Sequence, residues 1–240
     1  MSGSEALSKK IQGLKVVVRI LERHEVLTTY GIGYHDGPKK LAAILSAISG
    51  FRSKNASILK SGLLVLMISN FNDSEWSMFL QFISDELRSK IKVLSVIDLD
   101  ERSDSVSLGA HEILILKIGR VEHQVWNYLM CKSTYPPLAT GSIGASFLGD
   151  LGRPFIQTAN HTHATNDITY VHTQSVYQAI MRGDLAKVER FIADFRDPGS
   201  QMSKDFLAYG EQSSGERDKF ESILDLICTD ELFITVLQGN

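Results

Sequence analysis

Short apolar runs alternate along this chain with stretches in which apolar residues recur every three or four positions. The longest uninterrupted apolar run covers only residues 63–68, whereas a helix needs about 20 apolar residues to cross a bilayer. Short runs of this kind are typical of buried strands, and the three-to-four spacing is typical of amphipathic helices. The pattern predicts a soluble chain in which helices and strands share one or more interior cores.

The helical spacing is strongest toward the two ends of the chain. Before residue 90, helices are expected over residues 4–27, 38–50 and 74–87. Strands are expected over residues 63–68, 92–99 and 112–118. Further helices are expected over residues 175–181, 185–195, 216–227 and 230–237. The expected fold class is α+β, with helices at both ends around a small central sheet and a helical C-terminal third.

The composition changes between residues 133 and 173, where Gly, Pro, Thr, Asn and His accumulate. Such a stretch predicts a domain boundary or a functional loop region. The chain then divides into an N-terminal α+β region over 1–132, a loop region over 133–173 and a helical region over 174–240. With 240 residues, 43% of them hydrophobic, the chain is also long enough to bury one core as a single domain.

Charge is distributed unevenly along the chain, although the formal net charge is only −3. Residues 1–60 hold ten basic and four acidic side chains, a net charge of +6, and residues 201–240 hold three basic and eight acidic ones, a net charge of −5. This polarity suits a protein that contacts a polyanion with one end or packs head to tail with copies of itself. Contacts with an anionic membrane surface or RNA are expected from Lys9, Lys10, Lys15, Lys39, Lys40, Arg52, Lys54 and Lys60.

A short proline motif, Tyr135, Pro136, Pro137 and Leu138, suggests a peptide-mediated contact. Paired prolines hold a segment extended, so that the flanking Tyr and Leu project as anchors. The tetrapeptide resembles the YPxL late-domain motif, through which matrix and Gag proteins of some enveloped viruses recruit the host membrane-scission machinery. The resemblance covers these four residues and implies a host trafficking protein as a partner, while a plain proline turn is the alternative.

Two clusters of side chains raise the alternative of metal chemistry. Asp98 and Asp100 follow an apolar run, as Mg²⁺ ligands do in phosphoryl-transfer enzymes. The densest histidine cluster offers candidate zinc ligands in His161, His163 and His172, with Asp167 nearby. Neither cluster completes a known motif, and a solvated turn and a polar loop explain them more simply. We therefore expect no metal and no cofactor.

The remaining signals concern the compartment and the general class of protein. Cys131 and Cys228 lack CxxC spacing, which favours a reducing compartment, and the first residues lack a signal-peptide pattern. The expectation is a cytoplasmic protein, associated with a membrane if its anionic partner is a lipid surface.

The expected function is that of a non-enzymatic assembly protein that forms homo-oligomers and contacts an anionic partner. The most specific version of this expectation is a viral matrix-like or nucleoprotein-like structural protein. The alternatives are a Mg²⁺-dependent phosphoryl-transfer or hydrolytic enzyme using Asp98 and Asp100, and an RNA-binding protein.

Overall fold

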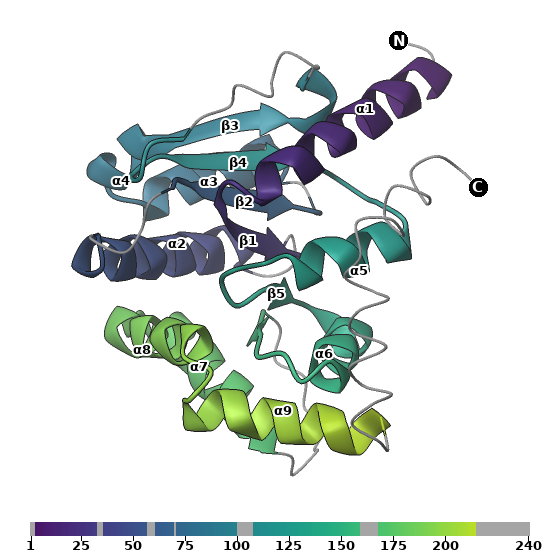
Figure 1. Ribbon diagram of the computed structural model, residues 1–240. Coiled ribbons are helices and arrows are strands. Elements are labelled where there is room, and N and C mark those ends of the chain that lie inside the picture. The colour runs from purple at the N-terminus through teal and green to yellow at the C-terminus, as the bar shows by residue number, and fades with distance from the viewer. Residues whose placement is uncertain are drawn as a thin grey trace.

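The computed structural model describes residues 3–32, 36–56, 61–69, 71–99, 108–158 and 168–214. The six strands in this part of the chain are β1 (Glu25–Thr29), β2 (Leu63–Met67), β3 (Ile91–Ser95), β4 (Ile113–Lys117), β5 (Leu138–Ala139) and β6 (Ile156–Gln157). They form one sheet in the order β3-β4-β2-β1-β5-β6, and every neighbouring pair is parallel. The expected mixture of helices and strands is confirmed. The two alternate along the chain and the strands are parallel, which is an α/β arrangement and differs from the expected α+β class with helices at both ends of a small sheet (Figure 1).

The helices before β5 are α1 (Gly3–Leu21), α2 (Gly37–Lys54), α3 (Asp73–Phe82), α4 (Asp85–Lys90) and α5 (His123–Cys131). A single 3-10 turn, η1 (Val96–Asp98), follows β3. The later helices are α6 (Gly141–Asp150), α7 (Ile168–Arg182), α8 (Leu185–Arg196) and α9 (Gln201–Ser214). The helices expected over residues 216–227 and 230–237 lie outside the described residues. Among those described, no helix is long and apolar enough to cross a membrane.

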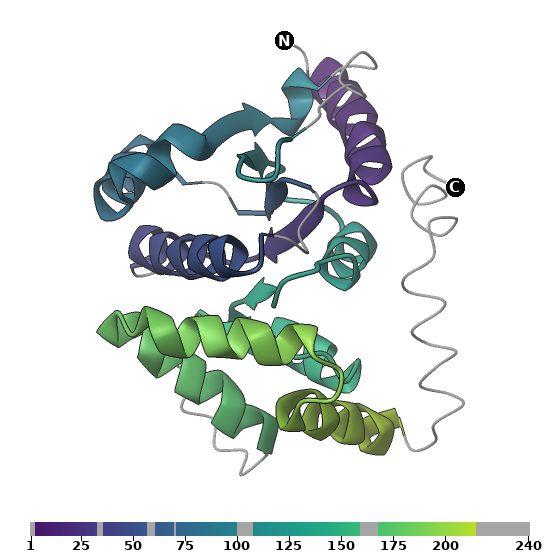
Figure 2. The ribbon, with the colours of Figure 1, turned by 60° about the vertical axis from the view of Figure 1, so that its left-hand side comes forward.

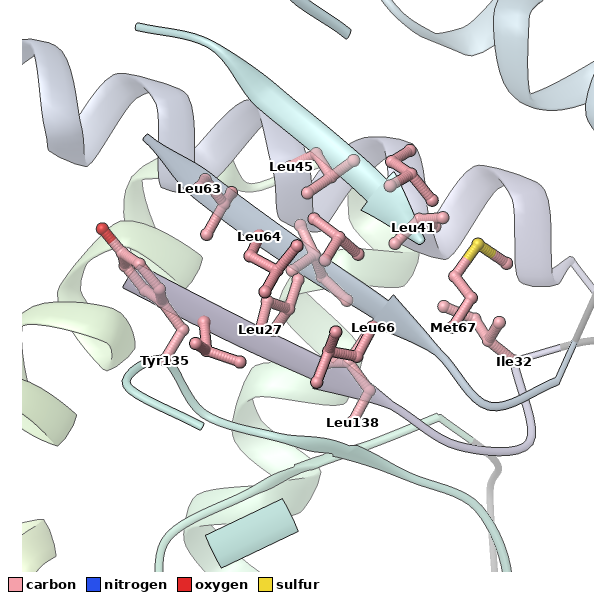
Figure 3. Close-up of a cluster of buried hydrophobic side chains, with 14 of the residues drawn as sticks. Leu27, Ile32, Leu41, Leu45, Leu63, Leu64, Leu66, Met67, Tyr135 and Leu138 are labelled. Atoms are coloured by element: carbon pink, nitrogen blue, oxygen red, sulfur yellow. The ribbon is translucent and has the colours of Figure 1, made fainter. Parts of the chain in front are cut away.

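Helices cover both faces of the sheet. Figure 2 shows α2 on one side of the strands and α1 and α5 on the other. All five residues of β2 and the first four of β4 are buried, because a strand covered on both faces needs apolar residues at successive positions. Figure 3 shows side chains of β1, β2 and β5 gathered with Leu41 and Leu45 of α2 in one apolar cluster.

Several boundaries differ from the sequence prediction, and two of them have clear causes in the hydrogen bonding. The first expected helix ends at Leu21, and β1 begins at Glu25, where its N–H donates to the Gly62 carbonyl and pairing with β2 starts. The third expected helix is interrupted at Ile83, because Ser84 accepts from the Leu87 N–H and starts α4. Capping signals and long-range strand pairing therefore set these limits more strongly than apolar spacing does.

Residues 133–158 supply β5, α6 and β6, although the composition of this region predicted a loop or boundary. Thr29 at the end of β1 pairs with Leu138 of β5, so this region extends the sheet that the N-terminal residues begin. The helices α7, α8 and α9 pack beside it, with α7 against β6 and α8 against α2. In Figure 1 these three helices lie beyond the β5 and β6 side of the sheet.

Candidate ligand site at the carboxyl edge of the sheet

The strand order changes direction between β1 and β5. From β1 the chain passes through α2 to β2 on one side, whereas β5 lies on the other side and is followed by α6 and β6. Parallel α/β sheets bind ligands outside the carboxyl ends of their strands at such a reversal, because the two outgoing helices leave toward opposite faces. The ends of β1 and β5 are therefore where a ligand site is expected.

Two glycines bring the backbone segments at this point close together. Gly31 follows β1 with φ +69°, and a Cβ there would meet the Thr140 Oγ1 at 1.4 Å. Gly37 opens α2, and a Cβ there would meet the Ile32 carbonyl oxygen at 1.6 Å. Only glycine allows both contacts, so these positions let the chain turn sharply from β1 into α2 and touch the exit of β5.

The amino-terminal ends of α2 and α6 both lie at these strand ends. The N-cap residues are Asp36 for α2 and Thr140 for α6, and neither side chain caps its helix. The first-turn N–H groups of a helix have no partners within the helix, and the helix dipole makes this end positive. Two such ends at one place favour an anionic group.

Lys40 adds a full positive charge in the first turn of α2. Its side chain is buried, with 4% of its surface exposed. Its Nζ donates to the Thr158 carbonyl oxygen at 2.8 Å, directly after β6, and lies 5.6 Å from the centre of the Tyr177 ring of α7. Burial lowers the pKa of Lys40, and the charge of Asp36 opposes this shift. Because the dipole disfavours a cation in this turn, a bound anion would stabilise the ammonium group.

The other basic candidates do not gather around Lys40. Arg52 lies twelve residues further along α2, about 18 Å away at the helical rise. It is buried, which lowers its pKa. Its guanidinium pairs with Glu25 and donates to the Ser61 and Ala110 carbonyls. Lys40 therefore lies near the carboxyl ends of the strands, and Arg52 lies near their amino ends.

The remaining bases lie on α1 and near the two ends of α2. On α1, Lys9 pairs with Glu5 at 3.5 Å, Lys10 donates to the Arg120 carbonyl, and Lys15 is exposed. On α2, Lys39 is exposed and Lys54 pairs with Glu189. Lys60 lies outside the described residues. The structure therefore divides the expected set among α1 and both ends of α2.

The motif from Tyr135 to Leu138 is buried throughout. The Tyr135 hydroxyl donates to Glu25 Oε2 at 2.9 Å, and burial raises the pKa of this tyrosine. Leu138 opens β5 and pairs with Thr29 of β1. In this fold the segment leads into the sheet, and a partner that reads Tyr135 and Leu138 would first have to separate β5 from β1.

The metal candidates are placed apart from one another. Asp98 is exposed after β3, three strands from β1, which corresponds to about 14 Å. His172 of α7 pairs with Asp205 of α9 at 2.8 Å. Asp100, His161, His163 and Asp167 lie outside the described residues. In the part of the chain that the structure describes, no three His, Cys, Asp or Glu side chains could hold one ion.

Comparison with known proteins adds no assignment, because no family model matches the chain and no curated protein or solved structure matches it either. The site therefore rests on geometry alone. Sequence reasoning included Lys40 among eight basic candidates but did not assign Gly31, Gly37, Thr140 and Thr158 to a site. Glycines directly after a strand and before a proline-opened helix are the signal that could have revealed the first two.

Proposed function

We propose that this protein binds a small anionic ligand that carries a phosphate group, such as a nucleotide, outside the carboxyl ends of β1 and β5. One observation carries the proposal: α2 and α6 begin together where the strand order reverses, and Lys40 lies in the first turn of α2. Backbone amides at the two helix ends would bind phosphate oxygens, and the Lys40 ammonium would supply a full charge.

The burial of Lys40 strengthens the attraction between its ammonium group and a bound phosphate. Coulomb attraction between an ammonium and a phosphate is several times stronger in a partly buried site than in water. The proposal keeps the anionic partner expected from the sequence but makes it a small ligand. An extended polyanion would need many exposed bases on one surface. Lys40 and Arg52 are instead both buried, Lys40 near the carboxyl ends of the strands and Arg52 near their amino ends.

Isothermal titration calorimetry with ATP, ADP, UDP and inorganic phosphate tests the proposal. Lys40→Met keeps the length of the side chain and removes its charge, and Lys15→Met removes one charge from an exposed position on α1. We expect the dissociation constant of the best ligand to rise at least about tenfold in Lys40→Met, as for loss of a charge-assisted hydrogen bond. Lys15→Met should leave it unchanged.

The folding of Lys40→Met needs its own control, because the Thr158 carbonyl loses a donor at a cost of about 1–3 kcal/mol. Urea unfolding and circular dichroism establish that the variant is folded, and Lys40→Arg, which retains a charge, should recover part of the binding. Equal weakening by Lys15→Met and Lys40→Met would indicate a diffuse basic surface instead. Failure of the wild-type protein to bind any of the four ligands would overturn the proposal.

A further inference from the structure

Tyr30 directly follows β1 and lies at the place where the strand order reverses. Its N–H donates to the Leu138 carbonyl at 2.9 Å, so its backbone continues the pairing between β1 and β5. The hydroxyl oxygen of Thr140, the N-cap residue of α6, lies 3.5 Å from the Tyr30 carbonyl oxygen. Gly31, which approaches Thr140 closely, comes next in the chain. Tyr30 therefore belongs to the backbone that forms the candidate ligand site.

The Tyr30 side chain points to the face of the sheet opposite α2. The Thr28 hydroxyl, two residues earlier, donates to the Leu129 carbonyl of α5 at 2.7 Å, and residues two apart in an extended chain point to the same face. The Tyr30 ring accordingly contacts Trp126 of α5, with ring centres 5.2 Å apart and planes at 61°. Figure 2 shows α2 and α5 on opposite sides of the strands. Lys40 thus approaches the site from one face and Tyr30 from the other.

Trp126 is the centre of an aromatic cluster that supports the Tyr30 ring. Its ring centre lies 5.2 Å from that of Phe147 on α6 and 5.3 Å from that of His123 at the start of α5. A Cβ at Gly144 of α6 would meet the Trp126 Cζ2 at 3.4 Å, so the indole packs against the amino-terminal half of this helix. Trp126 is 4% exposed. The cluster therefore holds Tyr30 from its buried side.

Two features of this cluster point to a ligand with a planar ring. Tyr30 remains 40% exposed, and a tyrosine ring held in place offers a stacking surface at low entropic cost. Among the described residues, none accepts a hydrogen bond from the buried Trp126 Nε1. Buried donors are normally paired, so this N–H is available to an acceptor atom of a ligand. A nucleobase supplies both a planar ring and acceptor atoms.

We propose that the ligand of this site is a nucleotide whose base stacks on Tyr30 while its phosphate group binds at the ends of α2 and α6. The inference rests on the proposed phosphate site and adds the part of the ligand which that site does not specify. A free phosphate or a sugar phosphate would leave the Tyr30 ring without a contact. Stacking does not select one base, because every base has a π-face.

Isothermal titration calorimetry tests the stacking by comparing each nucleotide with its phosphate chain. The pairs are ATP with tripolyphosphate and UDP with pyrophosphate. We expect Tyr30→Ala to raise the dissociation constant of the bound nucleotide at least about fivefold, as for loss of one base–aromatic stack. The dissociation constant of the phosphate chain should stay unchanged. Lys40→Met should instead weaken both members of the pair, because it acts on the phosphate group.

Three further variants separate stacking from packing. Tyr30→Phe keeps the ring and should bind as the wild type does. Tyr30→Leu keeps apolar bulk against Trp126 but removes the ring, so it should lose nucleotide affinity even if Tyr30→Ala does not fold. Phe82→Ala removes a ring that is 52% exposed at the last residue of α3, and it should leave both dissociation constants unchanged. Circular dichroism establishes that each variant is folded.

The phosphate site and the base stacking fail in different ways. If no nucleotide and no phosphate chain binds the wild-type protein, the proposed phosphate site is wrong and the stacking falls with it. If the phosphate chains bind but the nucleotides do not, the phosphate site stands and the stacking is overturned. The stacking is also overturned if Tyr30→Leu leaves the affinities for nucleotide and phosphate chain unchanged, or weakens both equally.

Discussion

At the scale of single residues, Glu25 organises the amino edge of the sheet. Its carboxylate pairs with Arg52 of α2, accepts from the Tyr135 hydroxyl at 2.9 Å and pairs with Arg196 of α8 at 2.6 Å. Arg196 also lies over the rings of Tyr135 and Phe51. One carboxylate therefore contacts two guanidiniums and ties β1 to α2, α8 and the approach to β5.

Removal of the Glu25 charge should destabilise the protein strongly. Glu25→Gln leaves the buried Arg52 without its carboxylate, and the loss of one partner of a buried ion pair costs about 3–5 kcal/mol. Glu189→Gln is the control, because Lys54 is 69% exposed and such pairs contribute about 0–1 kcal/mol. Urea unfolding gives both values, and similar small losses for the two variants would show that Glu25 is dispensable.

Single residues also show that long-range side-chain contacts could not be predicted from the sequence. The sequence placed Lys40 among eight basic residues expected to contact an anionic partner. The burial of Lys40 depends on Thr158 and Tyr177, which lie more than one hundred residues away and cannot be inferred from local pattern. Tyr135 matched a peptide motif that needs exposure, but its pairing with Glu25 is a long-range contact of the same kind.

At the scale of elements, the strongest apolar patterns were predictable, whereas β1, the helix α9 and the two shortest strands were not. The apolar runs that became β2 and β4, and the stripe that became α2, follow from sequence spacing alone. The two-residue strands β5 and β6 are too short to show any period. The carboxyl-edge site was missed for this reason, because without β5 there is no reversal of strand order to recognise.

The link between α7 and α9 should depend on pH. The hydrogen bond from His172 holds the pKa of Asp205 below its usual range. A carboxyl group whose pKa is lowered by folding stabilises the folded state above its unfolded pKa, and this contribution is lost as the pH falls through the lowered value. Asp205→Asn should therefore be less stable than the wild type at neutral pH, and the difference should shrink in acid.

The size of this effect is modest, about 1 kcal/mol or less, because the pair is partly exposed. Urea unfolding of wild type and Asp205→Asn at neutral pH and near pH 3 measures the difference. Asp194→Asn, an exposed aspartate on α8, controls for the general loss of a negative charge. A stability difference that stays constant with pH would assign Asp205 a structural role that does not depend on its ionisation.

At the scale of the whole molecule, the charge polarity of the sequence does not become a single basic face in the described residues. The basic candidates divide among α1 and the two ends of α2, and Arg52 and Lys54 are paired with carboxylates. The parallel sheet instead places the candidate ligand site outside the carboxyl ends of β1 and β5.

The central claim is that an anionic ligand binds where β1 and β5 end. Hydrogen exchange with mass spectrometry, with and without saturating ATP, tests it most directly, since bound N–H groups exchange more slowly. We predict slower exchange in peptides that cover residues 29–32 and the first turns of α2 and α6, with α1 and the Arg52 end of α2 unchanged. Slower exchange confined to α1 or to the Arg52 end would contradict the claim and return the anionic partner to the basic surface.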